Sequence, residues 1–179
     1  MKKNSSIGNF NVFKGPFSIV LEESAIIGKR NKFVRGKRGI SYGTSSLSLG
    51  RNAIVVSDHH LDLTRSIRFG EDSILAGIRS QLWTHGYVHA SKGSGRYRVD
   101  GSIDIGKNVY LGSGVLINPG VKIADTINVG GNATISKDLI TPGMYVNQPL
   151  RLLDKSFETI KSKLKKVDEV GLVEDVYEK

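Results

Sequence analysis

A repeat of six residues runs from Ile105 to Ile140 and constrains the fold of this chain more than any other feature. The stretch reads IGKNVY, LGSGVL, INPGVK, IADTIN, VGGNAT and ISKDLI. Cut in sixes, it aligns a first aliphatic column of Ile105, Leu111, Ile117, Ile123, Val129 and Ile135. A second column, four residues later, consists of Val109, Val115, Val121, Ile127, Ala133 and Leu139. Because neither a helix nor a hairpin meander has this period, the repeat predicts a solenoid.

The residue after each first-column position is small or polar, which favours a tight corner after a short flat strand. Three such strands close a triangular coil, and stacked coils bury one continuous aliphatic prism. Towards the N-terminus the frame is marked by Leu49, Val55, Leu61 and Ile67, then slips by two residues and resumes at Phe69, Leu75 and Gln81. We interpret this slip as a bulge or a widened corner.

The repeat stops after Trp83 and returns at Ile103 or Ile105. The interruption, THGYVHASKGSGRYRVDG, is rich in Gly, Ser, His and basic residues. Insertions in repeat proteins leave the solenoid as loops on one edge and often carry the function. We therefore predict a protruding loop over about residues 84–102.

These tandem hexapeptides resemble those of the hexapeptide-repeat acyltransferases, and among them the sugar and polysaccharide O-acetyltransferases, over about Leu47 to Leu153. The resemblance implies an all-β fold, the left-handed parallel β-helix, although the general rule for parallel crossovers favours the right hand. It also implies an enzyme that moves an acetyl group from acetyl-CoA to a hydroxyl of a sugar or polysaccharide precursor. The expected assembly is a homotrimer with an active site at each subunit interface.

The domain organisation expected is a β-helix domain over residues 1–153 and a C-terminal helical tail over residues 154–179. Pro142, Gly143 and Pro149 break the period and end the solenoid. Beyond them, apolar residues at helical spacing predict an amphipathic helix from about Ser156 to Val167.

Acyl transfer to a hydroxyl needs a general base, and a histidine near its ordinary pKa is the natural candidate. The chain has four histidines, His59, His60, His85 and His89, all in the slipped coil or in the interruption. In the acyltransferases that the chain resembles, the catalytic histidine follows a strand at the start of the protruding loop. The segment WTHGYVH places His85 at that point. We expect His85 to be the general base; the alternative is a loop residue hydrogen-bonded to the backbone.

Three further residues are candidates for binding the acceptor. His89 lies inside the predicted loop, where it can shape the acceptor pocket. With an offset of twenty residues between coils, we expect Asp62 beneath Leu82, near the base of His85, and His60 beneath Ser80. Asp62 could fix the tautomer of the imidazole or hold an acceptor hydroxyl.

For the acyl donor, the resemblance implies that coenzyme A lies in a groove between subunits. Its contacts in the family map to Ser113, Gly131, Ser136, Lys137 and Arg151. Ser113 and Gly131 are 18 residues apart, which equals one coil of three hexapeptides, so they should stack. They can bond the pantetheine amides, while Lys137 and Arg151 can neutralise phosphates. Asn132 and the Asn147-Gln148-Pro149 segment depart from the family pattern.

The formal net charge of +9 raises the question of nucleic acid as a partner. The cations are spread along the chain without an aromatic-interleaved patch, so a polyanionic cofactor or an acidic glycan fits the charge better. The basic segment at residues 29–38 is either a solvated outer face or an anion site. No apolar run is long enough for a signal peptide or a membrane span, and we expect a cytoplasmic protein without membrane insertion.

The sequence leaves three other functions open. The chain could be an N-acyltransferase acting on a nucleotide-linked amino sugar. It could also be a zinc enzyme similar to the γ-class carbonic anhydrases, with His60, His85 and His89 as ligands. The third possibility is a non-catalytic, sugar-binding solenoid. For the O-acetyltransferase itself, we expect acetyl-CoA as the donor substrate and no metal requirement.

Overall fold

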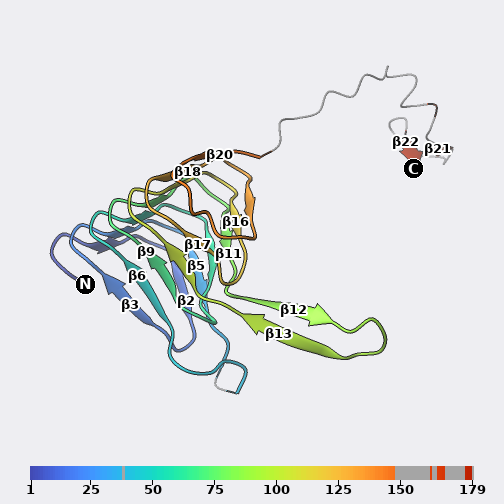
Figure 1. Cartoon of the computed structure of the whole chain (residues 1–179), viewed down its shortest axis with the longest axis horizontal. Coiled ribbons are helices and arrows are strands. Elements are labelled where there is room, and N and C mark those ends of the chain that lie inside the picture. Colours follow the sequence, from blue (N-terminus) through green and yellow to red (C-terminus); the bar gives the residue numbers. More distant parts are fainter. Residues whose placement is uncertain (38, 148–161, 163–164, 168–175, 179) are drawn as a thin grey trace. The chain divides into compact units, whose positions relative to one another are not determined.

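The computed structural model describes residues 1–37, 39–147, 162, 165–167 and 176–178. The chain divides into two units, residues 1–147 and residues 148–179. In the first unit the backbone winds into stacked triangular coils (Figure 1), and no helix occurs among the described residues of either unit. The fold of the first unit is the predicted left-handed parallel β-helix. None of the described segments is a helix able to cross a membrane.

Three parallel sheets form the faces of the β-helix, and the chain visits them in the order A, B, C. Face A consists of β1 (Ser6–Ile7), β4 (Ile26–Ile27), β7 (Ile54–Val55), β10 (Ile74–Leu75), β15 (Tyr110–Leu111), β18 (Ile127–Val129) and β20 (Gly143–Tyr145). Face B consists of β2 (Val12–Lys14), β5 (Lys32–Val34), β8 (His60–Asp62), β11 (Gln81–Leu82), β16 (Leu116–Ile117) and β19 (Thr134–Ile135). Face C consists of β3 (Ser18–Leu21), β6 (Ser46–Leu49), β9 (Ile67–Phe69), β14 (Ile103–Ile105) and β17 (Lys122–Ile123).

Both aliphatic columns predicted from the sequence point into the prism. Every residue of the first column is at most 5% exposed. The second column is also buried, except that Leu139, in the last coil, is partly buried against the core. The rings of Phe33 and Phe69 are the largest fully buried side chains among the described residues and help to fill the interior. Burial of this continuous apolar column is the main force that holds the stacked strands together.

The corners formed by glycine allow close stacking because no side chain stands where one coil meets the next. At Gly28, an added Cβ atom would overlap the carbonyl oxygen of Val56 in the following coil. On another corner Asn52 and Asp72 both have positive φ angles, of 56° and 57°, and their side chains form a hydrogen bond of 2.8 Å. Residue type at the corners therefore sets how closely the coils approach.

The predicted offset between coils is wrong by one residue on face B. The offset of twenty holds on face C, where Leu49 pairs with Phe69. On face B, however, His60 pairs with Gln81 and not with Ser80. The additional residue lies in the corner after β10, where Gly77 adopts a φ of 65°. As a result Leu82, and not Gln81, is the buried residue of β11, and Asp62 lies level with Trp83.

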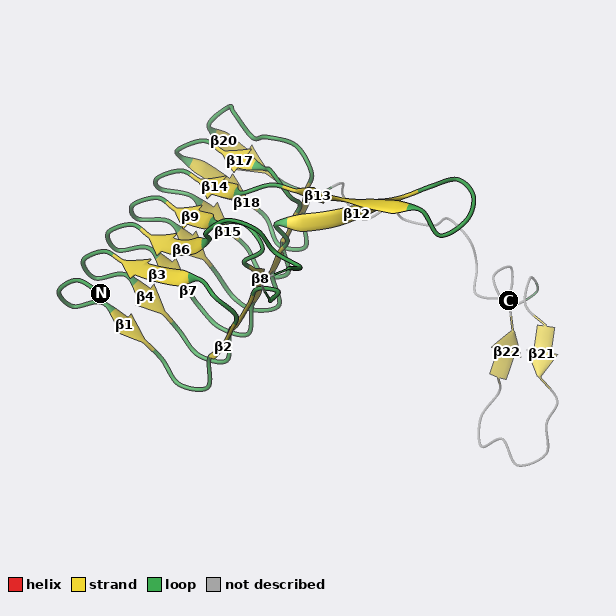
Figure 2. Ribbon diagram, turned by 90° about the horizontal axis from the view of Figure 1, so that it is seen from below, coloured by secondary structure: helices red, strands yellow, loops and turns green. Residues whose placement is uncertain are grey.

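The interruption after Trp83 is an antiparallel hairpin of β12 (His85–His89) and β13 (Arg96–Asp100). It projects from the B/C corner, the edge at which the chain passes from face B to face C (Figures 1 and 2). A second excursion, residues 36–45, leaves the same corner two coils earlier, between β5 and β6. This 36–45 segment, of which residue 38 is not described, was not predicted.

Most of the helix predicted from about Ser156 to Val167 lies outside the described residues, as does Arg151. Within that span the structure describes Ser162, which lies in a turn, and Lys165–Val167, which form strand β21, paired antiparallel with β22 (Val176–Glu178). For these three residues the prediction is wrong, since pairing with a second strand satisfies the backbone groups in place of helical hydrogen bonds.

Candidate active site

His85 lies at the B/C corner, where the hairpin leaves the coil, and its side chain is 27% exposed. Its Nδ1 atom lies 2.8 Å from Oδ2 of Asp62, at the end of β8 in the preceding coil. The side chain of Asp62 is only 6% exposed. Coil stacking therefore brings together a carboxylate and an imidazole that are far apart in the sequence, as the coil offset predicted in outline.

Two threonines hold the carboxylate of Asp62. Thr84 donates its backbone N–H and its hydroxyl to Oδ2, at 2.9 and 2.7 Å. Thr64 donates its hydroxyl to Oδ1 at 2.8 Å and its N–H at 3.2 Å. Burial alone would raise the pKa of Asp62, but the hydrogen bonds from Thr84, His85 and Thr64 outweigh it, so the pKa is lowered. Asp62 is therefore ionised near neutral pH.

An ionised Asp62 fixes the tautomer of His85. The carboxylate can only accept, so Nδ1 of the imidazole carries the proton and donates to it. The other ring nitrogen, Nε2, is then the basic atom. A carboxylate that orients an imidazole in this way also stabilises the imidazolium that forms when Nε2 takes up a proton.

Aromatic rings flank the imidazole of His85. Tyr87 of β12 and Trp83 approach it edge-on, with ring centroids 5.9 and 6.1 Å away. Trp83 also stacks on His60, at 4.9 Å between centroids, and its indole N–H donates to Gln81 at 3.0 Å. Flat amphipathic rings of this kind, with polar groups at their edges, suit contact with the apolar faces and hydroxyls of a sugar.

His60 therefore borders the site without touching His85, because Trp83 lies between the two imidazoles. Burial, and then the nearby Lys32 ammonium, lower the pKa of His60, and Asp62 offsets this only in part. His60 is neutral at pH 7. His89, at the other end of β12, is four residues from His85, which is roughly 13 Å along an extended strand.

The remaining histidine, His59, is a buried residue of the A/B corner, the edge between faces A and B. Its ring accepts a hydrogen bond at Nδ1 from the N–H of Ser80, at 3.1 Å. Burial is the main cause that lowers the pKa of His59, to about 4. It is therefore a neutral structural group.

The three histidines considered for zinc do not converge within one protomer. The ring of Trp83 separates His60 from His85, and His89 lies farther along the hairpin. Over the described ranges, no group of three or more His, Asp or Glu side chains is arranged as metal ligands.

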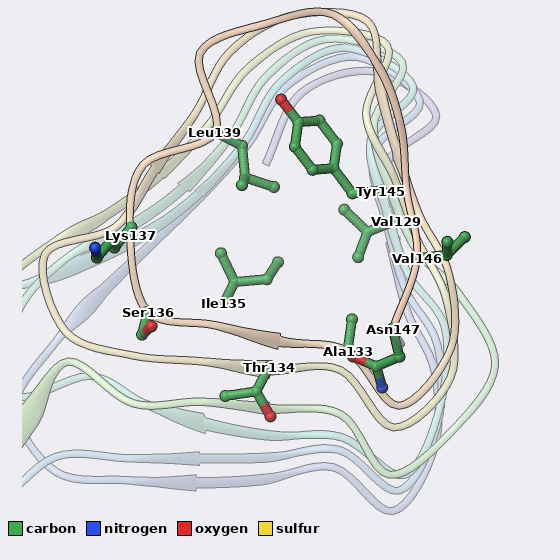
Figure 3. Close-up of a pocket in the computed structure, with 10 residues that line it drawn as sticks. All are labelled: Val129, Ala133, Thr134, Ile135, Ser136, Lys137, Leu139, Tyr145, Val146 and Asn147. Atoms are coloured by element: carbon green, nitrogen blue, oxygen red, sulfur yellow. The ribbon is translucent and has the colours of Figure 1, made fainter. Parts of the chain in front are cut away.

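The residues predicted to bind coenzyme A fall into two places on the β-helix. Ser113 and Gly131 stack at the A/B corner, as predicted, and the carbonyl of Ser113 accepts from the N–H of Asn132 at 2.8 Å. Ser136 and Lys137 are exposed at the B/C corner of the last coil, beside a cavity of about 240 Å³ (Figure 3). This cavity lies inside the last described coil, and Ile135, Leu139 and Tyr145 point into it.

One face of the prism separates these two groups within a protomer. From Ser113 to Asn118 the chain crosses face B, and five residues of extended strand span roughly 16 Å. His85 shares the B/C corner with Ser136 and Lys137, while Ser113 and Gly131 lie at the A/B corner. A single protomer therefore does not gather all of the predicted donor contacts around His85.

Thr64, Thr84 and Trp83 were not identified from the sequence. Thr64 and Thr84 are twenty residues apart, close to the spacing of one coil, and Thr84 directly precedes the candidate base. Two threonines one coil apart were a signal that could have predicted the hydrogen bonds to the carboxylate of Asp62. Trp83 carried no such signal, because its contact with His60 depends on the additional residue at Gly77.

Comparisons with known proteins find similar proteins by sequence and by structure. No family model matches the chain. A galactoside O-acetyltransferase of Escherichia coli is 28% identical over 137 residues, which cover 76% of this chain and 66% of that protein. The chain therefore spans just under two thirds of the length of this relative.

Two solved structures share the fold. One is the polySia-specific acetyltransferase NeuO, with a TM-score of 0.52, 14% identity and coverage of 86% of this chain and 92% of that one. The other is a mutant of AntD, an N-acyltransferase from Bacillus cereus, in complex with dTDP-4-amino-4,6-dideoxyglucose and coenzyme A. Its TM-score is 0.52 and its identity 13%, over 90% of this chain and 88% of that one. These two structures confirm the predicted fold, and the sequence relative agrees with the resemblance that the hexapeptides indicate.

Proposed function

We infer that this chain belongs to the hexapeptide-repeat acyltransferases, and we propose that it transfers an acetyl group from acetyl-CoA to a hydroxyl of a sugar. The observation that carries the proposal is the pair formed by Asp62 and His85 at the base of the hairpin, with Nδ1 and Oδ2 2.8 Å apart. The similarity to a galactoside O-acetyltransferase supports a sugar as the acceptor.

In the proposed reaction, Nε2 of His85 removes the proton of the acceptor hydroxyl as its oxygen attacks the thioester carbonyl carbon. Asp62 stabilises the imidazolium that results. A backbone N–H of the hairpin or of a neighbouring coil stabilises the negative charge on the carbonyl oxygen. When the tetrahedral intermediate collapses, the carbon–sulfur bond breaks and the leaving thiolate takes the proton from Nε2. The products are an acetylated sugar and free coenzyme A.

The donor would bind between subunits of a homotrimer. Because face B separates the A/B corner from the B/C corner, Ser113 and Gly131 of one protomer would meet the His85 corner of its neighbour. Ser113 and Gly131 would contact the pantetheine, while Ser136, Lys137 and Arg151 would contact the phosphates. The complex of AntD with coenzyme A shows that a related β-helix binds this molecule. A protein that uses acetyl-CoA in this way would act in the cytoplasm.

The outer side of face A supports an oligomer. Ile26, Ile54, Ile74 and Tyr110 are paired in register there and form one row across four coils. Ile26 is 37% exposed and Tyr110 is 45% exposed in the single chain. A contiguous apolar row on a surface is the kind of feature that subunit contacts bury.

The acceptor can be found by following free thiol. Purified protein is mixed with acetyl-CoA and a panel of sugars, sugar nucleotides and amino sugars, and the products are identified by mass. We expect thiol release only with hydroxyl acceptors, and a product that carries one acetyl ester. An acetamide product would show N-acylation, and no thiol release with any acceptor would refute the proposal. Metal analysis of the same preparation tests the zinc-enzyme alternative.

A further inference from the structure

The 36–45 segment contacts the hairpin that begins at His85, through Arg98 of β13. Arg98 of β13 joins the two excursions. Its guanidinium pairs with both oxygens of Asp100, at 2.7 and 2.9 Å, and also donates to the carbonyl of Ile40 at 2.5 Å. Asp100 in turn lies opposite His85 in the register of the hairpin. The segment is therefore fixed next to the candidate base.

A buried arginine holds the same segment from the coil side. Arg35 is 5% exposed and donates to the carbonyls of Pro16, Tyr42 and Gly43, at 2.6, 2.9 and 2.7 Å. The backbone at Tyr42 is thus held in place, while the ring of Tyr42 remains 59% exposed. A fixed backbone with an exposed ring is a pre-organised contact surface.

Arg65 lies on that ring. Its guanidinium carbon is 4.8 Å from the centroid of Tyr42. Its backbone N–H donates to the hydroxyl of Thr84 at 2.9 Å, so Arg65 is attached to the residue that precedes His85. In the part of the chain that the structure describes, no carboxylate lies within ion-pair distance of Arg65. Stacking on an aromatic face directs a guanidinium without using its N–H donors.

Two other cations border the site. Lys32 pairs in register with His60 on face B and is exposed. The guanidinium of Arg96 lies 5.1 Å over the ring of Tyr87. Among the described residues, neither cation has a carboxylate partner.

Asp100 is paired with the cation Arg98, and the single negative charge of the buried Asp62 is outnumbered by the charges of Arg65, Lys32 and Arg96. The surface around the base is therefore positive and attracts an anion.

We propose that the acceptor is an acidic sugar and that Arg65, stacked on Tyr42, binds its carboxylate. This inference rests on the function proposed above and names the class of acceptor. A planar guanidinium with free N–H groups matches a carboxylate in a bidentate pair, which fixes orientation as well as adding affinity. Held by Arg65, the sugar would present one hydroxyl to Nε2 of His85.

The test compares sugars that differ at C6, among which the galacturonoside and its methyl ester form the pair that differs chiefly in charge. Methyl galactoside, the corresponding galacturonoside, its methyl ester and galactose 6-phosphate are assayed for thiol release with the full-length protein. We expect kcat/KM to be about 10–100-fold higher for the galacturonoside than for the neutral galactoside or the ester. Arg65→Ala should raise KM for the galacturonoside by a similar factor, with kcat within about threefold and neutral acceptors unaffected. Arg65→Lys should restore part of the preference.

Arg68→Ala is the matched control, because Arg68 is exposed on the outer side of face C and pairs there with Asp104 at 2.8 Å. It should change none of these values. Equal rates with charged and neutral sugars, or an unchanged preference in Arg65→Ala, would overturn this inference and leave the proposed acetyl transfer intact. Faster transfer to the sugar phosphate would overturn it as well. Absence of transfer to every acceptor would instead refute the proposed function, and this inference with it.

Discussion

Replacing Asp62 by Asn tests whether the buried carboxylate supports the base. The substitution keeps the shape of the side chain but removes its charge and turns one acceptor atom into a donor. In the native site Oδ2 accepts from Thr84 and His85, and Oδ1 accepts from Thr64. An amide has a single oxygen, so in either orientation its NH₂ group faces N–H or O–H donors that lose their acceptor. Leaving such a group unpaired in a buried site costs about 1–3 kcal/mol.

We expect two separate effects of Asp62→Asn. The melting temperature should fall by a few degrees, as about 1–3 kcal/mol implies for a protein of this length. The value of kcat should fall by about 10²–10⁴-fold, since the imidazole loses both its fixed tautomer and the anion that stabilises its protonated form. Thiol release and thermal denaturation measure the two effects on one preparation.

Asp104→Asn is the control for that experiment, because Asp104 forms an exposed pair with Arg68 on face C, away from the B/C corner. It should leave kcat within about twofold, since exposed pairs of this kind contribute roughly 0–1 kcal/mol. If Asp62→Asn kept kcat within about threefold of the unsubstituted protein while remaining folded, the role given to Asp62 would be refuted.

Three further predictions concern stability and the donor. Because burial lowers the pKa of His59 to about 4, its unfolded form binds more protons between pH 6.5 and 4, so the free energy of unfolding should fall over that window as the pH falls. The loss in the free energy of unfolding should be at most about 3 kcal/mol, and protonation of Nδ1 would also break its hydrogen bond with the N–H of Ser80. Thermal denaturation followed against pH measures the loss, which should vanish in His59→Gln. Gly28→Ala should destabilise the fold by about 1–3 kcal/mol in urea denaturation, because the new Cβ overlaps the carbonyl of Val56; an unchanged midpoint would contradict the coil spacing. Lys137→Ala should raise KM for acetyl-CoA by about tenfold with little change in kcat, and an unchanged KM would exclude Lys137 from the phosphate contact.

Much of the fold could be predicted because its determinant is a short repeat with strict alternation. The six-residue period specifies which side chains enter the prism, and both aliphatic columns are buried accordingly. Handedness did not follow from the period, since the general preference for crossovers is opposite. It came from the family resemblance alone.

The parts that could not be predicted depend on single residues and on contacts between loops. The additional residue at Gly77 shifts face B by one position, so His60 lies under Gln81, and no hydrophobic pattern marks such a corner. The 36–45 segment has no repeat and no motif of its own. Its contacts with Arg98 of the hairpin and with Arg65, at the B/C corner of the intervening coil, arise because all three lie on the same edge of the β-helix.

The site around His85 also has one part that the sequence predicted and one part that it did not. His85 could be placed from the point at which the repeat stops, and the coil offset brought Asp62 near it. The threonines that keep Asp62 ionised, and the ring of Trp83 between His60 and His85, needed the three-dimensional register. Arg151 lies outside the described residues, and its contact with coenzyme A stays a prediction.

The most direct test of the whole account is the effect of His85→Ala on turnover and on coenzyme A binding, measured with one acceptor by thiol release and by titration calorimetry. If the imidazole held by Asp62 is the base for acetyl transfer, kcat falls by about 10²–10⁴-fold while the affinity for coenzyme A stays within about twofold. Turnover that survives the substitution would contradict the account.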